Sequence, residues 1–202
     1  MHRFVLGGLA LTACGGSPAG PPAEPTSRAA LAWAVPGGFR SETLGFPLEF
    51  APDVVHRGLE ELRFAPGFFE PATPGYWSYA FAWRTQDPAA LDAAELSGEL
   101  TAYFRGLVDA VDDKLGVRDA ISVTAAAEGA RFQLTAHVFD AFKTKLPLEL
   151  TGWAERLDCG ASGAVWRFVL APAASGVRPQ LDALAAQVAC EQPALPPPPE
   201  RK

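Results

Sequence analysis

Hydrophobic residues recur with the period of an α-helix in one long segment of the chain. Between residues 92 and 116 they form one broad apolar stripe: Leu96, Leu100, Tyr103, Phe104, Leu107, Val108, Val111 and Leu115. Asp92, with Glu95 three residues later, fits a capping box, and Gly116 suits the position just after a helix end. The pattern predicts an amphipathic helix whose apolar stripe covers another layer of the protein.

After residue 120, the hydrophobic period changes to that of β-strands. Apolar and polar residues alternate there, and turn-forming residues separate the alternating runs. Short connections favour antiparallel neighbours, because parallel strands need long crossover segments. The pattern predicts four strands, over residues 120–127, 131–139, 146–157 and 164–171, followed by a second helix over residues 177–189.

Before the long helix, frequent prolines interrupt the chain. Strands are predicted there over residues 44–50, 58–64 and 76–84. The third strand places its large side chains on one face, opposite small residues; these are Trp77, Tyr79, Phe81 and Trp83. We expect the four rings to form core beside the long helix. The alternative is that they line a cavity for a lipid or a glycan.

The order of these elements favours an α+β domain. Strands, a helix, a strand meander and a second helix predict an antiparallel β-sheet with two helices packed on one face. We expect one such domain over residues 28–191, which is long enough to bury an adequate core.

The other face of such a sheet would be open. If the polar positions of two neighbouring strands align, they form a surface around an exposed tryptophan, made of Thr135, His137, Thr151, Trp153 and Glu155. This surface is a candidate binding face for a protein, a glycan or peptidoglycan. The alternative is a plain solvated face with Trp153 covered by a loop or by the tail.

Composition is that of a globular protein with polar ends. The 202 residues are 49% hydrophobic and 20% charged, and the formal net charge is -6. An acidic chain without a run of Lys and Arg is a poor binder of nucleic acid, so no nucleic-acid partner is expected. Proline-rich segments flank the domain: residues 14–27 are expected to be a tether, and residues 192–202 a disordered tail.

The beginning of the chain carries a targeting pattern. Arg3 precedes a short apolar run over residues 4–10, and Leu11, Thr12, Ala13 and Cys14 follow. The run is too short to span a bilayer as a helix. The four residues resemble the lipobox of bacterial lipoproteins.

The resemblance implies that residues 1–13 are a signal peptide and that Cys14 becomes the lipidated first residue. A diacylglyceryl group and an acyl chain such as palmitate would then anchor the protein in a membrane. Gly15 stands where many inner-membrane lipoproteins carry Asp, and this resemblance favours the outer membrane, facing the periplasm. The alternative is an ordinary secretory signal with an incidental cysteine.

The two remaining cysteines are expected to form a disulfide. If Cys14 carries lipid, Cys159 and Cys190 are an even pair in an oxidising compartment. The alternative is two free buried thiols. A zinc site is disfavoured, because neither cysteine has a second Cys or His at ligand spacing.

Signatures of catalysis are weak. His56 and His137 stand in no metal-binding or catalytic motif, and Glu60 and Glu61, adjacent on a strand, point to opposite faces. The segment from Gly160 to Gly163 lacks the spacing of a nucleophile elbow and is better explained as a hairpin loop. No catalytic residue, metal or cofactor is therefore predicted.

Three functions remain open. The first is a membrane-anchored, non-catalytic envelope protein that binds a protein or cell-wall partner. The second is a periplasmic hydrolase-like enzyme that uses His56 or His137 with an acid and a serine. The third is a carrier of a lipid or another hydrophobic ligand, which would require a sizeable cavity between the sheet and the long helix.

Overall fold

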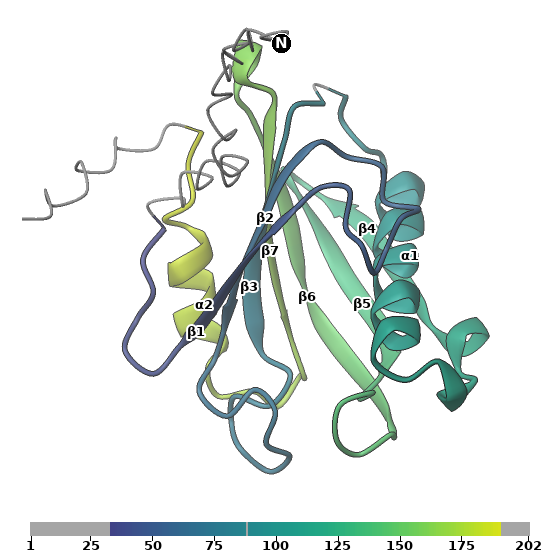
Figure 1. Ribbon diagram of the computed structural model, residues 1–202. Helices are drawn as coiled ribbons and strands as arrows, with labels where there is room; N and C mark the ends of the chain where they lie inside the picture. Colours follow the sequence, from purple (N-terminus) through teal and green to yellow (C-terminus); the bar gives the residue numbers. More distant parts are fainter. Residues whose placement is uncertain (1–32, 88, 191–202) are drawn as a thin grey trace, which may run out of the picture. The chain divides into compact units, whose positions relative to one another are not determined.

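One antiparallel sheet of seven strands runs through the protein (Figure 1). The computed structural model describes residues 33–87 and 89–190. The strand order in the sheet is β1-β2-β3-β7-β6-β5-β4. The bounds are Arg40–Gly45 for β1, Gly58–Phe64 for β2, Tyr79–Thr85 for β3, Ser122–Glu128 for β4, Arg131–Phe139 for β5, Pro147–Asp158 for β6 and Ala164–Ala171 for β7. The predicted α+β class is confirmed.

Within the described residues the sheet is accompanied by two α-helices, α1 over Ala93–Asp112 and α2 over Arg178–Ala185. Short 3-10 turns follow at Asp113–Leu115 and Arg118–Ala120, and a third, Gly160–Ser162, lies in the β6–β7 hairpin. The predicted capping box of α1 is present. The Asp92 side chain accepts the backbone N–H of Glu95 at 2.9 Å, and the Glu95 carboxylate accepts the N–H of Asp92 at 2.8 Å.

The helices differ from the expected arrangement, because they lie on opposite faces of the sheet (Figure 1). Alternate residues of β3 show this. Phe81 packs in the cluster that contains the α1 side chains, whereas Ala80 and Ala82 pack in the cluster that contains Leu181 and Leu184 of α2. Because Ala80 and Ala82 are small, α2 packs close to the sheet on this face. The large rings on the other face need the broader apolar stripe of α1.

The strand bounds follow the predictions closely after α1 and less closely before it. The strand predicted over residues 44–50 is wrong in position: β1 ends at Gly45, and residues 46–57 leave the sheet and pass against α1. Gly106 of α1 allows this approach, because a Cβ there would lie only 2.0 Å from the carbonyl oxygen of Phe50. The loop therefore packs directly against α1.

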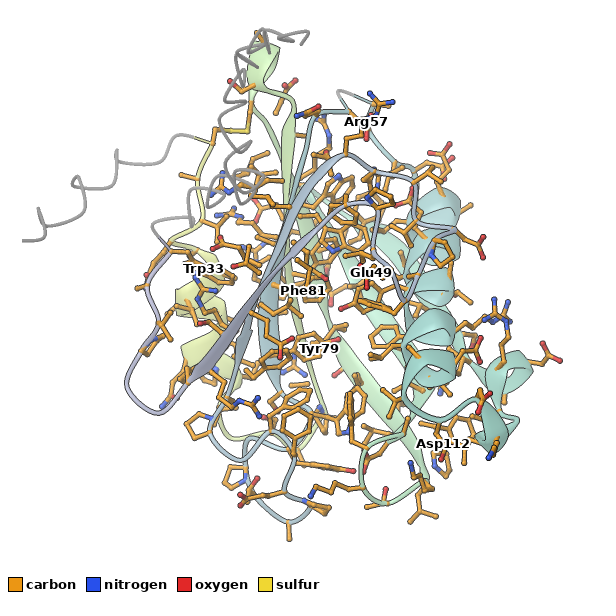
Figure 2. All side chains as sticks on the ribbon, in the orientation of Figure 1. Trp33, Glu49, Arg57, Tyr79, Phe81 and Asp112 are labelled. Atoms are coloured by element: carbon orange, nitrogen blue, oxygen red, sulfur yellow. A yellow bond between two sulfur atoms is a disulfide. The ribbon has the colours of Figure 1, made fainter. Side chains whose placement is uncertain are left out.

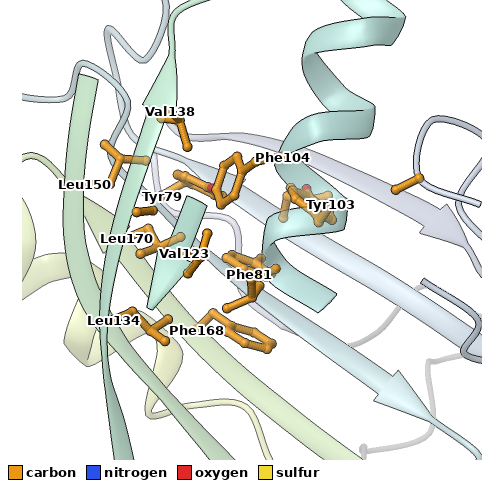
Figure 3. Packing of buried hydrophobic residues seen from close by; sticks show 14 of the residues in the cluster. Tyr79, Phe81, Tyr103, Phe104, Val123, Leu134, Val138, Leu150, Phe168 and Leu170 are labelled. Atoms are coloured by element: carbon orange, nitrogen blue, oxygen red, sulfur yellow. The ribbon is translucent and has the colours of Figure 1, made fainter. Parts of the chain in front are cut away.

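The core on the α1 side consists mainly of aromatic and leucine side chains (Figure 3). Tyr103 and Phe104 of α1 face Phe81 and Phe168 from neighbouring strands. The rings of Phe81 and Phe168 stack with centroids 4.3 Å apart and planes 4° apart. Complete burial of these side chains contributes roughly 2 kcal/mol each to folding.

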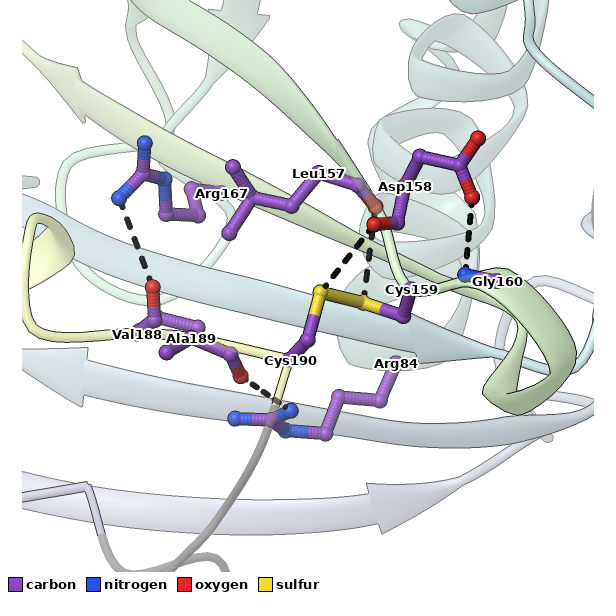
Figure 4. Close-up of a disulfide and its surroundings, with 9 residues drawn as sticks. All are labelled: Arg84, Leu157, Asp158, Cys159, Gly160, Arg167, Val188, Ala189 and Cys190. Atoms are coloured by element: carbon purple, nitrogen blue, oxygen red, sulfur yellow. Dashed lines mark hydrogen bonds between the residues drawn. A yellow bond between two sulfur atoms is a disulfide. The ribbon is translucent and has the colours of Figure 1, made fainter.

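A second, smaller core lies under α2. Trp33 lies beside α2, on the other side of β1 from Tyr79 and Phe81 (Figure 2), and its Nε1 donates to the Leu184 carbonyl at 2.8 Å. Cys159 and Cys190 form the predicted disulfide, which ties the segment after α2 to the β6–β7 turn (Figure 4). Arg84 donates to the Ala189 carbonyl beside it at 2.7 Å.

Candidate ligand-binding cavity

An aromatic cavity lies between α1 and the edge of the sheet formed by β1 and β2. Its volume is about 290 Å³. Its walls are mainly aromatic and leucine side chains, with one carboxylate: Glu42, Leu44, Phe50, Leu62, Phe64, Phe68, Phe69, Trp77, Tyr79, Tyr103, Leu107 and Phe142. The volume is close to the lower end of the ~300–1,000 Å³ found for small-molecule sites.

Three loops bring most of these rings to the cavity. Phe50 comes from the β1–β2 loop and meets Tyr103 of α1 edge-on, with centroids 5.0 Å apart. Phe69 comes from the β2–β3 loop, and Phe142 from the β5–β6 loop; their centroids are 5.1 Å apart. Segments far apart in the sequence therefore close the cavity together.

Trp77 has an unusual backbone conformation at this site. Its φ of 46° lies in the left-handed region, which bulky residues rarely adopt. This conformation just before β3 places the indole beside Phe68 and Phe142, at centroid distances of 5.4 and 5.8 Å. Such conformations cost about 1–3 kcal/mol and persist where the surrounding structure enforces them, often at ligand sites.

A hydrogen bond between Tyr76 and Asp140 joins two of the loops. The Tyr76 hydroxyl donates to Asp140 Oδ2 at 2.6 Å. The Asp140 carboxylate also accepts the backbone N–H groups of Phe142, Lys143 and Thr144. Burial opposes ionisation of Asp140, but these hydrogen bonds outweigh it and lower its pKa to about 2. The Asp140 carboxylate thus binds the backbone of Phe142 and also holds Tyr76, the residue next to Trp77.

Glu60 is a buried carboxyl group next to the cavity wall. Its side chain is fully buried, and Oε1 accepts the Nε1 proton of Trp83 at 2.9 Å. Oε2 has no hydrogen-bond partner within the described residues. Burial raises the pKa of Glu60 to about 7, although the Trp83 and Tyr103 side chains act against this rise. Burial and the Glu60 carboxylate in turn raise the pKa of Tyr103, a cavity residue, well above its usual value.

His56 lies between two carboxylates outside the cavity wall. Nδ1 is 3.2 Å from Asp87, and Nε2 is 2.7 Å from Glu99 of α1. Burial lowers its pKa, but the hydrogen bonds and charges of Glu99 and Asp87 more than compensate, so the pKa is raised. Because both ring nitrogens face carboxylates, neither is placed to take a proton from a serine. The other histidine of the described residues, His137, is exposed, and its Nδ1 lies 3.6 Å from a carboxylate oxygen of Glu149.

Helix α2 covers part of the predicted binding face around Trp153. Trp153 is only 8% exposed, and its Nε1 donates to Asp182 of α2 at 2.7 Å. Thr151 accepts a hydrogen bond from Arg178, and Glu155 pairs with Arg131 and Arg167. The expectation of an exposed tryptophan is therefore wrong, because α2 packs on this face.

The remaining two residues of the predicted face are not joined to that cluster. Thr135 of β5 is half-buried and pairs with Thr151 of β6. His137 lies further along β5 and is exposed. The structure thus brings Thr151 and Trp153 together beneath α2, whereas Glu155 forms its ion pairs with Arg131 and Arg167 of the neighbouring strands.

The expectation that the four large rings of the aromatic strand form core is confirmed, because all four are buried in the cluster that contains the α1 side chains. Two of them, Trp77 and Tyr79, also line the cavity. Most other lining residues were missed. The available signal was the density of phenylalanine in a proline-rich region, where Phe50, Phe64, Phe68 and Phe69 are too numerous for exposed turns.

Comparisons with protein families, with characterised proteins and with solved structures found no match. In the part of the chain that the structure describes, no helix is long and apolar enough to cross a membrane. Among the same residues, no group of three or more His, Cys, Asp or Glu is arranged to hold a metal ion. Cys14, the tether and the tail lie outside the described residues.

Proposed function

We propose that this protein is a non-catalytic binding protein of the bacterial cell envelope, and that its ligand is a small hydrophobic molecule. A lipid on Cys14 would anchor the protein in a membrane, as the lipobox resemblance implies. The domain would hold the ligand in the aromatic cavity beside α1. This function combines the anchored binding protein and the hydrophobic-ligand carrier of the sequence hypotheses.

The observation that carries the proposal is the aromatic cavity itself. Its space of about 290 Å³ is walled by eight aromatic rings, and a concave, mostly apolar lining with few polar groups is typical of small-molecule sites. Its volume suits one substituted ring or a short acyl chain rather than a whole phospholipid.

A protein or cell-wall partner and a hydrolase activity have less support. The candidate surface for a protein or cell-wall partner has its tryptophan packed under α2. A hydrolase would need a histidine nitrogen facing a nucleophile, and both nitrogens of His56 face carboxylates. The geometry around these residues instead suits structural roles.

A neutral, polarity-sensitive fluorophore tests the proposal. 1-Aminonaphthalene, a single substituted ring system, should bind the purified protein with a blue shift of its fluorescence, and Leu107→Trp, which fills the cavity from α1, should weaken this binding at least about tenfold. Leu146→Trp is the matched control, because Leu146 is exposed and does not line the cavity. Equal binding by both variants, or no binding by the wild-type protein, would refute a ligand site here.

A further inference from the structure

We propose that the cavity selects organic cations, molecules in which an ammonium group is attached to a small apolar body. This inference rests on the proposed function and adds the charge of the ligand to it. Three observations support it: the charge of the cavity mouth, the number of aromatic faces, and the absence of a cation in the described wall.

The charge at the cavity is negative. Of the described residues that line it, Glu42 alone is charged. Glu42 is exposed on the edge strand β1, opposite Leu62, so its carboxylate stands at the entrance. Neither Glu42 nor Glu60 forms an ion pair within the described residues. A ligand cation would give Glu42 the partner that it lacks.

Glu60 adds a second acidic group behind the wall. Leu44 of β1 pairs with Glu60 of β2, which places Glu60 diagonally behind Glu42 on the same face of the sheet. Its Oε2 is fully buried and has no hydrogen-bond partner among the described residues. A cation in the cavity would stabilise the ionised form of this carboxyl group across Tyr103.

The aromatic wall also favours a cation. The faces of aromatic rings carry negative charge density, and ring-lined sites that bind quaternary ammonium groups use this attraction. One ring of this wall already accepts a cation: the Arg40 guanidinium lies 5.1 Å from the centroid of Phe69. Arg40 does not line the cavity and forms no ion pair with Glu42 within the described residues, so Glu42 remains the charged group of the described wall.

Trp77 carries the one feature of the wall that would favour a hydrogen-bond acceptor or an anion, because its Nε1 is buried and has no acceptor among the described residues. The anionic probe described below therefore tests the proposal against this donor.

Three probes of nearly identical shape test the charge preference. Benzyltrimethylammonium, neopentylbenzene and benzylsulfonate have the same number of non-hydrogen atoms and carry a positive, a neutral and a negative head. Calorimetric titration of the purified protein should show the cation binding about tenfold more tightly than the neutral probe, with the anion weakest.

Glu42→Gln identifies the group responsible. It should remove most of the advantage of benzyltrimethylammonium over neopentylbenzene, because the amide keeps the size of the side chain and removes only its charge. Glu49→Gln is the control, because it removes the same charge from an exposed residue that does not line the cavity.

The outcomes separate the two proposals. If neopentylbenzene or benzylsulfonate binds as tightly as the cation, or if Glu42→Gln has the same effect as Glu49→Gln, the cation selectivity is refuted and the ligand site stands. If none of the three probes binds and the neutral fluorophore also fails, both proposals are refuted.

Discussion

The hydroxyl of Tyr76 and the carboxylate of Asp140, 64 residues apart in the sequence, lie 2.6 Å apart and join two of the loops around the aromatic cavity. One loop carries Phe68, Phe69 and Trp77, and the other carries Phe142. The cavity wall is therefore held by a polar contact as well as by ring packing.

Removing this contact should loosen the cavity. Tyr76→Phe keeps the ring and removes only the hydroxyl, so we expect a loss of about 1.5–3 kcal/mol, the usual contribution of a hydrogen bond to a charged group. Binding of the neutral fluorophore should weaken in parallel. Chemical denaturation at pH 7 measures the first effect, and fluorescence titration the second. An unchanged free energy of unfolding would contradict this role of Tyr76.

The Asp140 contact should also fail in acid. The pKa of Asp140 is lowered from 3.8 to about 2, so its contribution to stability is complete above pH 3.8 and is lost as the pH falls through about 2. Asp140→Asn should flatten that part of the pH dependence of unfolding. If the variant keeps the wild-type pH dependence of unfolding, the loss of stability in acid comes from other carboxylates.

Glu60 should make the protein less stable as the pH rises. Burial raises its pKa from 4.5 to about 7, so between these values the folded protein keeps a proton that the unfolded chain releases. The contribution of Glu60 to stability should fall across this window by about 3 kcal/mol and level off above it. His56, with its raised pKa, contributes a loss of the same sign at higher pH.

Comparison of two variants isolates the Glu60 effect. Glu60→Gln should remove most of the decrease between pH 4.5 and 7, and Glu49→Gln, at an exposed position, should retain it. Denaturant unfolding at a series of pH values provides the measurement. The assignment to Glu60 fails if both variants keep the wild-type slope.

Gly106 should be essential for the contact between α1 and the β1–β2 loop. An added Cβ would lie 2.0 Å from the Phe50 carbonyl oxygen, so Gly106→Ala should displace the loop and cost about 1–3 kcal/mol. Because Phe50 lines the cavity, probe binding should weaken too. Gly98→Ala, on the same helix with open space around it, should instead stabilise the protein by up to about 1 kcal/mol. Equal effects of the two substitutions would rule out this explanation.

The disulfide should contribute chiefly to stability. Cys159 and Cys190 are separated by 31 residues, and closing a loop of this length contributes about 3–4 kcal/mol in the chain-entropy model. The double variant Cys159→Ser, Cys190→Ser should lose about this amount in denaturant unfolding and still bind the neutral fluorophore. Loss of probe binding by the folded variant would show that the cross-link also shapes the cavity.

The membrane anchor is tested separately from the domain. Cys14→Ser should abolish labelling with a radioactive lipid precursor and release the protein from membranes, because Cys14 is the residue that the lipobox resemblance makes the acceptor. Unchanged labelling and membrane association in this variant would disprove the lipid anchor.

The elements that the sequence predicted best have strong local signals. The long helix combines a capping box with a continuous apolar stripe, and the hairpins after it have short turns that set the register. The segment before β2 lacks both signals. The strand over residues 44–50 was predicted from alternation alone. In the structure the chain leaves the sheet after Gly45 and packs against α1, where Phe50 lies close to Gly106.

The candidate site was less predictable, because non-local packing creates it. Whether Trp153 is exposed depends on which face α2 occupies, and the choice depends on the small residues Ala80 and Ala82 of a strand distant in sequence. The cavity likewise requires three loops to meet, and a single sequence gives no signal of that meeting. The Cys159–Cys190 pair was predictable because only two cysteines remained once Cys14 was assigned to lipid.

Because the two helices lie on opposite faces of the sheet, the disulfide and the aromatic cavity are also on opposite sides of it. Cys159 lies in the cluster beneath α2, whereas the aromatic cavity lies on the α1 side, and the strands stand between them. A reducing agent would therefore act on one side of the sheet and a ligand on the other. The protein could lose its covalent link while its ligand remained bound.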